Sequence, residues 1–226
     1  MSLFTLDRVP EPEVMSGDQE VDAYSSGTTA KHFEKIDDAF VAKALSMGVN
    51  SGVVLDVGTG PGQIPIKMAR LNSGMEIIGI DLSEAMLAKA EQDAKREGLY
   101  PRVSFRRGDG KVIPFDRNTF DLVISNSALH HIHEPIQFFN ELERVTRKDG
   151  AILIRDLRRP SKLAYRIHVS FFGRHYSGLM RSLYEDSVRA AYTYDELKDL
   201  IEKSNLSHVR VGRVGCSHLI VERSRK

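Results

Sequence analysis

Cysteine and long apolar runs are what this sequence lacks. The single cysteine, Cys216, excludes an internal disulfide framework and a zinc site built from cysteines. No apolar run approaches the roughly 20 residues that span a bilayer, and residues 1–20 are polar and acidic, without an apolar signal core. We therefore expect a cytoplasmic protein that does not cross a membrane.

Net charge is also nearly absent. The formal charge of +1 gives no general indication of a nucleic-acid partner. The basic residues are unevenly placed, however, because seven Lys or Arg and one acidic residue lie between Arg155 and Arg181. This segment is either a solvated helical face or a basic wall that faces an anionic partner.

The 226 residues fit one large α/β domain. From residue 53 to 154, short apolar strands alternate with helical patterns, which predicts a parallel sheet covered by helices on both faces. The strands are expected at 53–57, 76–81, 103–105, 120–126 and 151–154. Two more strands, at 209–214 and 218–222, are separated by a short link that predicts a hairpin.

The two ends of this core differ from it in pattern. Residues 1–50 are expected to form a helical N-terminal cap, whose first part is loosely ordered. Residues 51–226 would form the main domain. After Arg155 the regular alternation fades into a segment rich in aromatic residues, which either packs in the core or lines a pocket. We place an acceptor-binding insertion there, around 158–190.

The first expected strand ends in alternating glycines, Gly58, Gly60 and Gly62. Glycine permits backbone angles that other residues avoid and lets a ligand lie against the main chain. The free N–H groups of the following helix favour a negatively charged ligand group. The dinucleotide fingerprint G-x-G-x-x-G is not met, because Gln63 stands where its third glycine belongs, and no Lys-Ser or Lys-Thr completes a phosphate loop.

Acidic residues end the second and third expected strands. Asp81 is placed to accept hydrogen bonds from both hydroxyls of a ribose, in NAD or in any adenosine ligand. Asp109 is placed to accept one from an exocyclic amine such as that of adenine. Either acid could instead cap a loop, but together with the glycine loop they indicate a nucleoside ligand.

As a set, these motifs resemble those of class I S-adenosylmethionine-dependent methyltransferases, of the small-molecule type related to ubiquinone and menaquinone biosynthesis. The resemblance covers roughly residues 50 to 157. It rests on four segments, which are 55–62 (LDVGTGPG), 79–87 (GIDLSEAML), 108–115 (GDGKVIPF) and 120–132 (FDLVISNSALHHI).

The resemblance implies a doubly wound, mostly parallel, seven-stranded sheet of Rossmann-like type whose C-terminal strand runs antiparallel. It implies S-adenosyl-L-methionine as cofactor. Gly58 and Gly60 would approach its methionine part, Asp81 its ribose, Leu82 and Asp109 its adenine, and the Asn126 backbone its sulfonium end. The full set of implied cofactor-binding residues is Tyr24, Gly58, Thr59, Gly60, Asp81, Leu82, Asp109, Gly110 and Asn126.

Methyl transfer from a sulfonium is a displacement at an activated carbon, so the protein must mainly hold the acceptor close to the methyl group. A general base is needed only if the acceptor starts protonated. His130 and His131 follow the fourth expected strand, and histidine titrates near neutrality, so they are the candidate catalytic residues. The alternative is a structural role. We expect no metal, because successive side chains should splay apart and no third ligand pattern follows.

Arg158 and Arg159 leave the fifth expected strand at the edge where ligands bind in such sheets. Arginine can clamp a carboxylate or phosphate with paired hydrogen bonds, so either could bind an anionic acceptor. The alternative is that both pair with surface acids or are solvated.

We therefore predict methyl transfer to a small acceptor, which would be anionic if these arginines bind it. Two other enzymes stay open. An RNA methyltransferase would use the basic segment to contact phosphates, although no motif of the nucleic-acid enzymes follows the fourth strand and nucleic acid is not the expected partner. An oxidoreductase that uses a nicotinamide dinucleotide is disfavoured by the displaced third glycine. A binding module without turnover is the alternative outside the enzymes.

Overall fold

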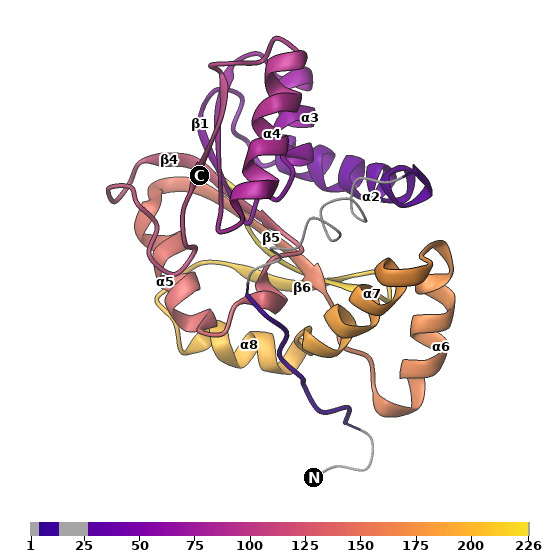
Figure 1. The fold of residues 1–226 in the computed structure, drawn as a ribbon. Helices are drawn as coiled ribbons and strands as arrows, with labels where there is room; N and C mark the ends of the chain where they lie inside the picture. The colour runs from indigo at the N-terminus through magenta and orange to yellow at the C-terminus, as the bar shows by residue number, and fades with distance from the viewer. Residues whose placement is uncertain (1–4, 14–26, 226) are drawn as a thin grey trace.

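The computed structural model describes residues 5–13 and 27–225, and its centre is a seven-stranded sheet with the order β3-β2-β1-β4-β5-β7-β6 (Figure 1). The strands are β1 (Gly52–Val57), β2 (Met75–Asp81), β3 (Val103–Arg107), β4 (Phe120–Asn126), β5 (Thr146–Leu157), β6 (Arg210–Val214) and β7 (His218–Arg223). All seven predicted strands are therefore present.

The pairing confirms the predicted mostly parallel, doubly wound sheet. Strand β1 pairs in parallel with both β2 and β4, while β2 and β4 pair in parallel with β3 and β5. Only β7 runs antiparallel to its neighbours, β5 and β6. The largest difference from the predicted bounds is in β5, which begins at Thr146 rather than at residue 151, while the other strands begin or end within two residues of the prediction. The strand order reverses between β1 and β4, and ligands of such sheets bind at the carboxyl ends beside that point.

Helices cover both faces of the sheet. Val54 and Leu55 are neighbours on β1, point to opposite faces and are both fully buried, which requires packing on each side. The helices that pack on the Val54 face are α2 (Gly27–Leu45), α3 (Gln63–Leu71) and α4 (Glu84–Arg96). Those on the Leu55 face are α5 (Pro135–Val145) and α8 (Tyr194–Glu202). Helix α2 belongs to the predicted cap, yet its Phe40 is buried in the core of the sheet.

The region expected as an insertion forms two more helices, α6 (Lys162–Phe172) and α7 (Gly178–Ala190), joined by the 3₁₀ turn η2 (Gly173–His175). They stand to the right of the sheet in Figure 1, beyond the carboxyl end of β5. No helix in residues 5–13 and 27–225 is long and apolar enough to cross a bilayer.

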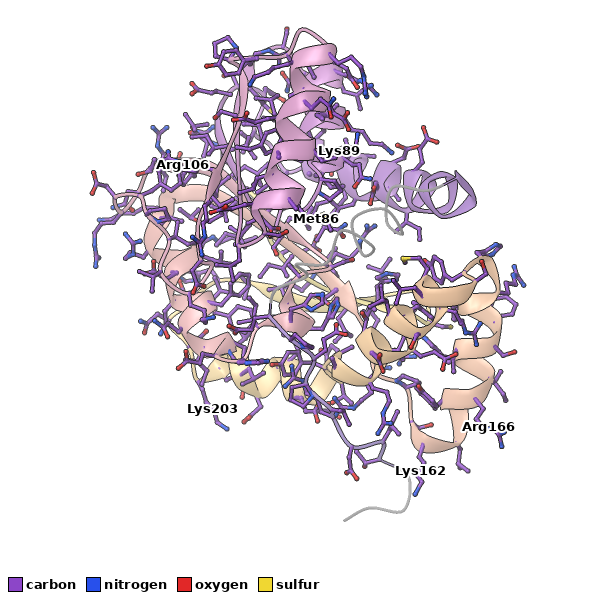
Figure 2. The ribbon with its side chains drawn as sticks, in the orientation of Figure 1. Met86, Lys89, Arg106, Lys162, Arg166 and Lys203 are labelled. Carbon is purple, nitrogen blue, oxygen red and sulfur yellow. The ribbon has the colours of Figure 1, made fainter. Side chains whose placement is uncertain are left out.

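The outer face of α6 carries part of the basic segment. Lys162 and Arg166 point away from the body of the protein (Figure 2), and both are exposed. Two strongly exposed apolar side chains lie beside them on the helix. Leu163 (72% exposed) follows Lys162, and Ile167 (74% exposed) follows Arg166. This part of the segment is a solvated helical face, as one of the two readings of the sequence predicted.

Asp121 on β4 links the amino ends of three strands. Its buried carboxylate accepts a hydrogen bond from the Val53 N–H of β1 (2.9 Å) and one from the Arg147 guanidinium of β5 (2.7 Å). Gly52 has no room for a side chain, because a Cβ atom there would lie 2.2 Å from the Asp121 carboxylate oxygen. The start of β1 therefore packs directly against the Asp121 carboxylate.

We predict that Asp121→Ala lowers the free energy of unfolding by about 1–3 kcal/mol, because it leaves the half-buried Val53 N–H without its partner and removes the buried carboxylate that pairs with the partly exposed Arg147. Urea denaturation followed by circular dichroism measures the change. Asp149→Ala is the matched control, since Asp149 makes only an exposed contact with Arg225 and should shift stability by less than about 0.5 kcal/mol. Equal effects of the two variants would contradict this assignment.

Candidate functional site

A cavity of about 550 Å³ lies at the carboxyl ends of the central strands. Its size is within the range of roughly 300–1,000 Å³ that is usual for small-molecule sites. Its walls include the glycine loop after β1, the end of β2, the turn after β4, and residues of α2, β5, α6 and α7. The residues that line it include Asp37, Asp56, Gly58, Thr59, Gly60, Asp81, Leu82, Gly108, Asn126, His130, His131, Arg155, Phe172, Tyr176, Met180, Tyr184 and Ser187.

The glycine loop turns its main chain toward the cavity. Gly58 (φ 74°), Gly60 (φ 52°) and Gly62 (φ 79°) all have positive φ, which disfavours other residues. A Cβ atom on Gly58 would lie 2.4 Å from the Ala128 Cβ atom, so glycine is also required there by packing. No described atom lies within 4 Å of the place where a Gly60 Cβ would stand. Gly60 is thus a bare stretch of backbone against open space.

Asp81 at the end of β2 is held in place by the glycine loop. Its Oδ2 atom accepts a hydrogen bond from the Gly60 N–H (2.8 Å), and Oδ1 accepts one from the Ser83 N–H (2.9 Å). The Leu82 N–H also acts on this carboxylate. A carboxylate has about four acceptor positions in all, so at least one is left for a ligand hydroxyl such as that of a ribose.

Asp56 and Asp37 add buried acids to the same cavity. Burial raises the pKa of Asp56 to about 7, against the opposing hydrogen bond from the Thr59 hydroxyl (2.7 Å), and the charge of Asp81 raises it further. Burial also raises the pKa of Asp37 to about 6, although Lys67 and Arg155 oppose this shift. Ionisation of these acids would be favoured by a positively charged ligand.

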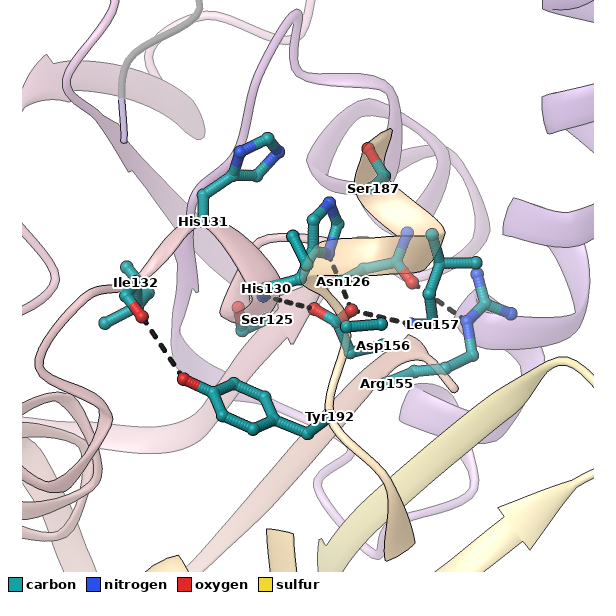
Figure 3. A network of polar contacts seen from close by, with 12 residues as sticks. Ser125, Asn126, His130, His131, Ile132, Arg155, Asp156, Leu157, Ser187 and Tyr192 are labelled. Carbon is teal, nitrogen blue, oxygen red and sulfur yellow. Dashed lines mark hydrogen bonds and ion pairs between the residues drawn. The ribbon is translucent and has the colours of Figure 1, made fainter. Parts of the chain in front are cut away.

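Arg155 on β5 lines the cavity beside Asn126 (Figure 3). Its Nε atom donates to the Asn126 side-chain oxygen (2.8 Å), and Nη1 donates to the Ile36 carbonyl (2.8 Å). Nη2 lies 3.9 Å from the Asp37 carboxylate and makes no hydrogen bond to any residue that the structure describes. Burial lowers the pKa of Arg155 to about 10. This arginine orients the residue that was predicted to face the sulfonium.

The two arginines predicted to bind the acceptor do not line the cavity. Arg159 is buried, and its guanidinium donates to the Leu6 carbonyl (2.8 Å), the Ala191 carbonyl (2.5 Å) and the Glu196 carboxylate. Arg158 donates to the Cys216 carbonyl (2.7 Å). Because the Arg159 guanidinium is fully engaged and Arg158 is turned toward the Cys216 carbonyl outside the cavity wall, the arrangement gives no support to their role as an anion clamp.

Two predicted adenine-site residues also lie outside the cavity wall. Gly108 lines the cavity, but the Asp109 side chain turns back to accept from the Lys111 N–H (2.8 Å). Gly110 is close-packed, because a Cβ atom there would lie 2.9 Å from Val57. Tyr24, predicted to act as a lid, is outside the described residues.

His130 and His131 lie side by side on the 3₁₀ turn η1 (Leu129–His131). Their ring centres are 4.2 Å apart and the planes are tilted by 37°, so the expectation that the two side chains splay apart is wrong. His130 is only 2% exposed, and its Nδ1 atom lies 2.6 Å from an Asp156 carboxylate oxygen (Figure 3). Asp156 was not predicted, because nothing in the sequence relates it to residues 26 positions earlier.

The two histidines have opposite electrostatics. Burial disfavours protonation of His130, but the charge and hydrogen bond of Asp156 outweigh it, so the pKa of His130 is raised. Burial, followed by the charge of His130, lowers the pKa of His131 to about 3. His131 is therefore neutral at physiological pH, and its low pKa suits a general base poorly. The lone pair of a neutral imidazole can instead bind a metal ion.

Comparisons with known proteins agree with this geometry. The family model described as a methyltransferase domain matches residues 49–205. An uncharacterized methyltransferase of Schizosaccharomyces pombe is 30% identical over 141 residues, which are 60% of this chain but only 50% of that protein. The demethylmenaquinone methyltransferase of Bacillus subtilis is 28% identical over 190 residues, covering 76% of this chain and 81% of that protein.

A solved structure shows the same fold over nearly the whole length. A putative S-adenosyl-L-methionine-dependent methyltransferase of Methanococcus maripaludis superposes with a TM-score of 0.68, at 17% identity, and the match covers 97% of each chain. At that identity the likeness concerns the fold alone.

We predict that Asp81→Asn weakens binding of S-adenosylmethionine by about 10–100-fold, since hydrogen bonds to a charged group contribute about 1.5–3 kcal/mol. The asparagine retains one oxygen, so the Gly60 loop should keep its conformation. Isothermal titration calorimetry measures the change. Glu84→Gln is the control, because Glu84 is exposed three residues away on the surface of α4. Unchanged affinity in Asp81→Asn would contradict the assignment of Asp81 to the cofactor.

Proposed function

The chain belongs to the methyltransferase domain family, as a class I S-adenosylmethionine-dependent methyltransferase, and we propose that it methylates a small acceptor held between the histidine pair and helices α6 and α7. The proposal depends on one observation, which is that this cavity is continuous. It begins at the glycine loop and Asp81, and it extends to His131 and to side chains of both helices. The cofactor and the acceptor would therefore lie in the same cavity.

We place the cofactor at the strand end of this cavity. The methionine part would lie on the bare backbone of Gly58 and Gly60, the ribose on Asp81, and the adenine beside Leu82. The sulfonium would face the backbone at Asn126. Support comes from the orientation of these groups toward the cavity and from the unused acceptor position of Asp81.

The acceptor end is apolar and aromatic. Phe172, Tyr176, Met180 and Tyr184 form its wall, and all four belong to the segment after Arg155 that the sequence placed either in the core or around a pocket. The Tyr184 hydroxyl is buried and makes no hydrogen bond to any described residue. A buried hydroxyl without a partner costs free energy, so an acceptor with a ring or chain body and one polar group would complete this wall. The name of the Bacillus subtilis relative, a demethylmenaquinone methyltransferase, is consistent with such an acceptor.

The reaction then needs little more than alignment. A lone pair of the acceptor attacks the methyl carbon, the carbon–sulfur bond of the sulfonium breaks, and its electron pair stays on sulfur to give S-adenosylhomocysteine. Orientation of the two reactants can contribute roughly 7–11 kcal/mol to lowering the barrier. We assign His130 and His131 to the acceptor side of this step.

The buried acids predict a pH dependence of cofactor binding. Ionisation of Asp37 and Asp56, whose pKa values are about 6 and 7, adds negative charge as pH rises from 5.5 to 8. S-adenosylmethionine carries a sulfonium charge that S-adenosylhomocysteine lacks. The ratio of their affinities should therefore shift toward S-adenosylmethionine by about fivefold or more, since one charge is worth about 1–2 kcal/mol across a protein site.

Calorimetric titration of both ligands at each pH measures this ratio, and because it is a ratio, effects common to both ligands cancel. Asp56→Asn should flatten the dependence above pH 6.5. A ratio that stays constant with pH in the wild-type protein would contradict the proposed place of the sulfonium near these acids.

The acceptor class is tested by incubating the protein with methyl-labelled S-adenosylmethionine and cell extract. We expect the label in a small-molecule fraction, and none when Asp81→Asn replaces the wild-type protein at a limiting cofactor concentration. Label in RNA would contradict the proposal and favour the nucleic-acid alternative. Family membership gives no support to the nicotinamide-dependent alternative. A cytoplasmic location stays a prediction from the sequence.

A further inference from the structure

Three potential metal ligands meet at the acceptor end of the cavity. The Glu11 carboxylate, from the N-terminal segment, lies 3.3 Å from His130 Nε2 and 3.2 Å from His131 Nδ1. The ligand atoms of all three residues lie within 4.8 Å of one another. The sequence predicted no metal because no third ligand follows the histidines. The third ligand instead comes from the opposite end of the chain.

The His130 ring is prepared to bind a cation. Its Nδ1 atom donates a hydrogen bond to Asp156 (2.6 Å), so in the neutral ring Nε2 carries a lone pair. Nε2 is buried, points toward Glu11 and makes no aligned hydrogen bond to any residue that the structure describes. A lone pair that faces a carboxylate in a buried site is unfavourable unless a proton or a metal cation lies between them.

We propose that Glu11, His130 and His131 bind one divalent transition-metal ion of the zinc type, with an open coordination position toward the cavity. The proposal rests on the function proposed above and extends it to activation of the acceptor. Two His and one Glu are a ligand set of catalytic zinc sites, which keep a fourth position for water or substrate. His130 and His131 both line the cavity, so that position faces the acceptor.

The distances fit this coordination. Ligand atoms about 2.0–2.1 Å from a tetrahedral zinc ion lie roughly 3.3–3.4 Å apart. The two distances from Glu11 to the imidazole nitrogens, 3.3 and 3.2 Å, are close to that value. In the metal-free protein, His131 Nδ1 also lies 3.2 Å from the Pro12 carbonyl, to which an Nδ1–H would donate, so metal binding requires the tautomer whose proton is on Nε2.

Supporting contacts hold two of the three ligands. Asp156 fixes the His130 ring through Nδ1, and a carboxylate in this position is usual behind a metal-binding histidine. The Ser187 hydroxyl of α7 donates to the Glu11 carboxylate (3.0 Å). Figure 3 shows Asp156 behind His130, with the two imidazole rings on the same side of the turn. Asp156 and Ser187 are positioning residues for this site.

The bound ion would prepare the acceptor for methyl transfer. An acceptor hydroxyl or thiol that takes the open position loses its proton to solvent, because coordination to zinc lowers its pKa strongly. The oxygen or sulfur lone pair then attacks the methyl carbon as the sulfonium releases its electron pair to sulfur.

The test is direct metal binding by the full-length protein without a polyhistidine tag, after removal of metals with a chelator. We expect one Zn²⁺ per chain by calorimetry, no competition from excess Mg²⁺, and visible absorption bands of tetrahedral Co²⁺ when CoCl₂ is added. Glu11→Gln and His131→Ala should each weaken Zn²⁺ binding by about 100-fold or more, and Asp156→Asn by about 10–100-fold.

Glu134→Gln is the matched control, because Glu134 is an exposed acid near the histidine pair and lies outside the cluster, and this variant should bind Zn²⁺ as the wild type does. Circular dichroism establishes that each variant is folded, and Glu11→Gln leaves the histidine pair intact if His131→Ala does not fold. Absence of stoichiometric Zn²⁺ binding by the wild type, or equal losses in Glu134→Gln and Glu11→Gln, would overturn the proposal and assign the cluster to a shared proton.

Titration of the metal-free protein with S-adenosylmethionine separates the two proposals. Cofactor binding without Zn²⁺ binding would overturn the metal site and leave the proposed function standing. Zn²⁺ binding without cofactor binding would overturn the placement of the cofactor instead.

Discussion

The hydrogen bond from the Gly60 N–H to the Asp81 carboxylate (2.8 Å) is the contact on which the site depends. It joins the loop after β1 to the end of β2, so the two walls of the cavity cannot move independently. It also explains two sequence features at once. Glycine is needed at position 60 because φ is positive there, and an acid is needed at position 81 because its two oxygens accept from the Gly60 and Ser83 N–H groups.

The buried acids follow from the same geometry. Parallel strands end at one edge of the sheet, so Asp56 on β1 and Asp81 on β2 are brought together even though they are 25 positions apart in the chain. Water is excluded there, which raises the pKa of both carboxyl groups. Burying two carboxyl groups close together costs free energy in the protein without a ligand. A ligand that brings positive charge to the site would offset this cost.

The sequence predicted what depends on local pattern and on parallel strand order. Short apolar runs predicted the seven strands, and the position of Asp81 at a strand end predicted its place at the ligand edge of the sheet. Contacts between distant segments could not be predicted. Arg159 was expected at the ligand edge, but Leu6 and Glu196 from remote segments occupy its guanidinium. Tyr184 carries no motif, and it lines the cavity only because α7 folds back toward η1.

The N-terminal segment is the largest departure from expectation, because residues 5–13 were expected to be loosely ordered. Arg8 donates to the Ala190 carbonyl (2.6 Å) and to the His130 carbonyl (3.0 Å), and its guanidinium lies 4.2 Å from the centre of the Tyr192 ring. Glu13 pairs with Lys111 (2.6 Å) on the other side of the cavity. These contacts fix the segment from both sides of Glu11, so Glu11 reaches the histidine pair with little freedom to lose. A metal-binding side chain that is already held in position binds more tightly than one on a flexible arm. The proposed metal site would therefore be completed by the part of the chain that is furthest from it in sequence.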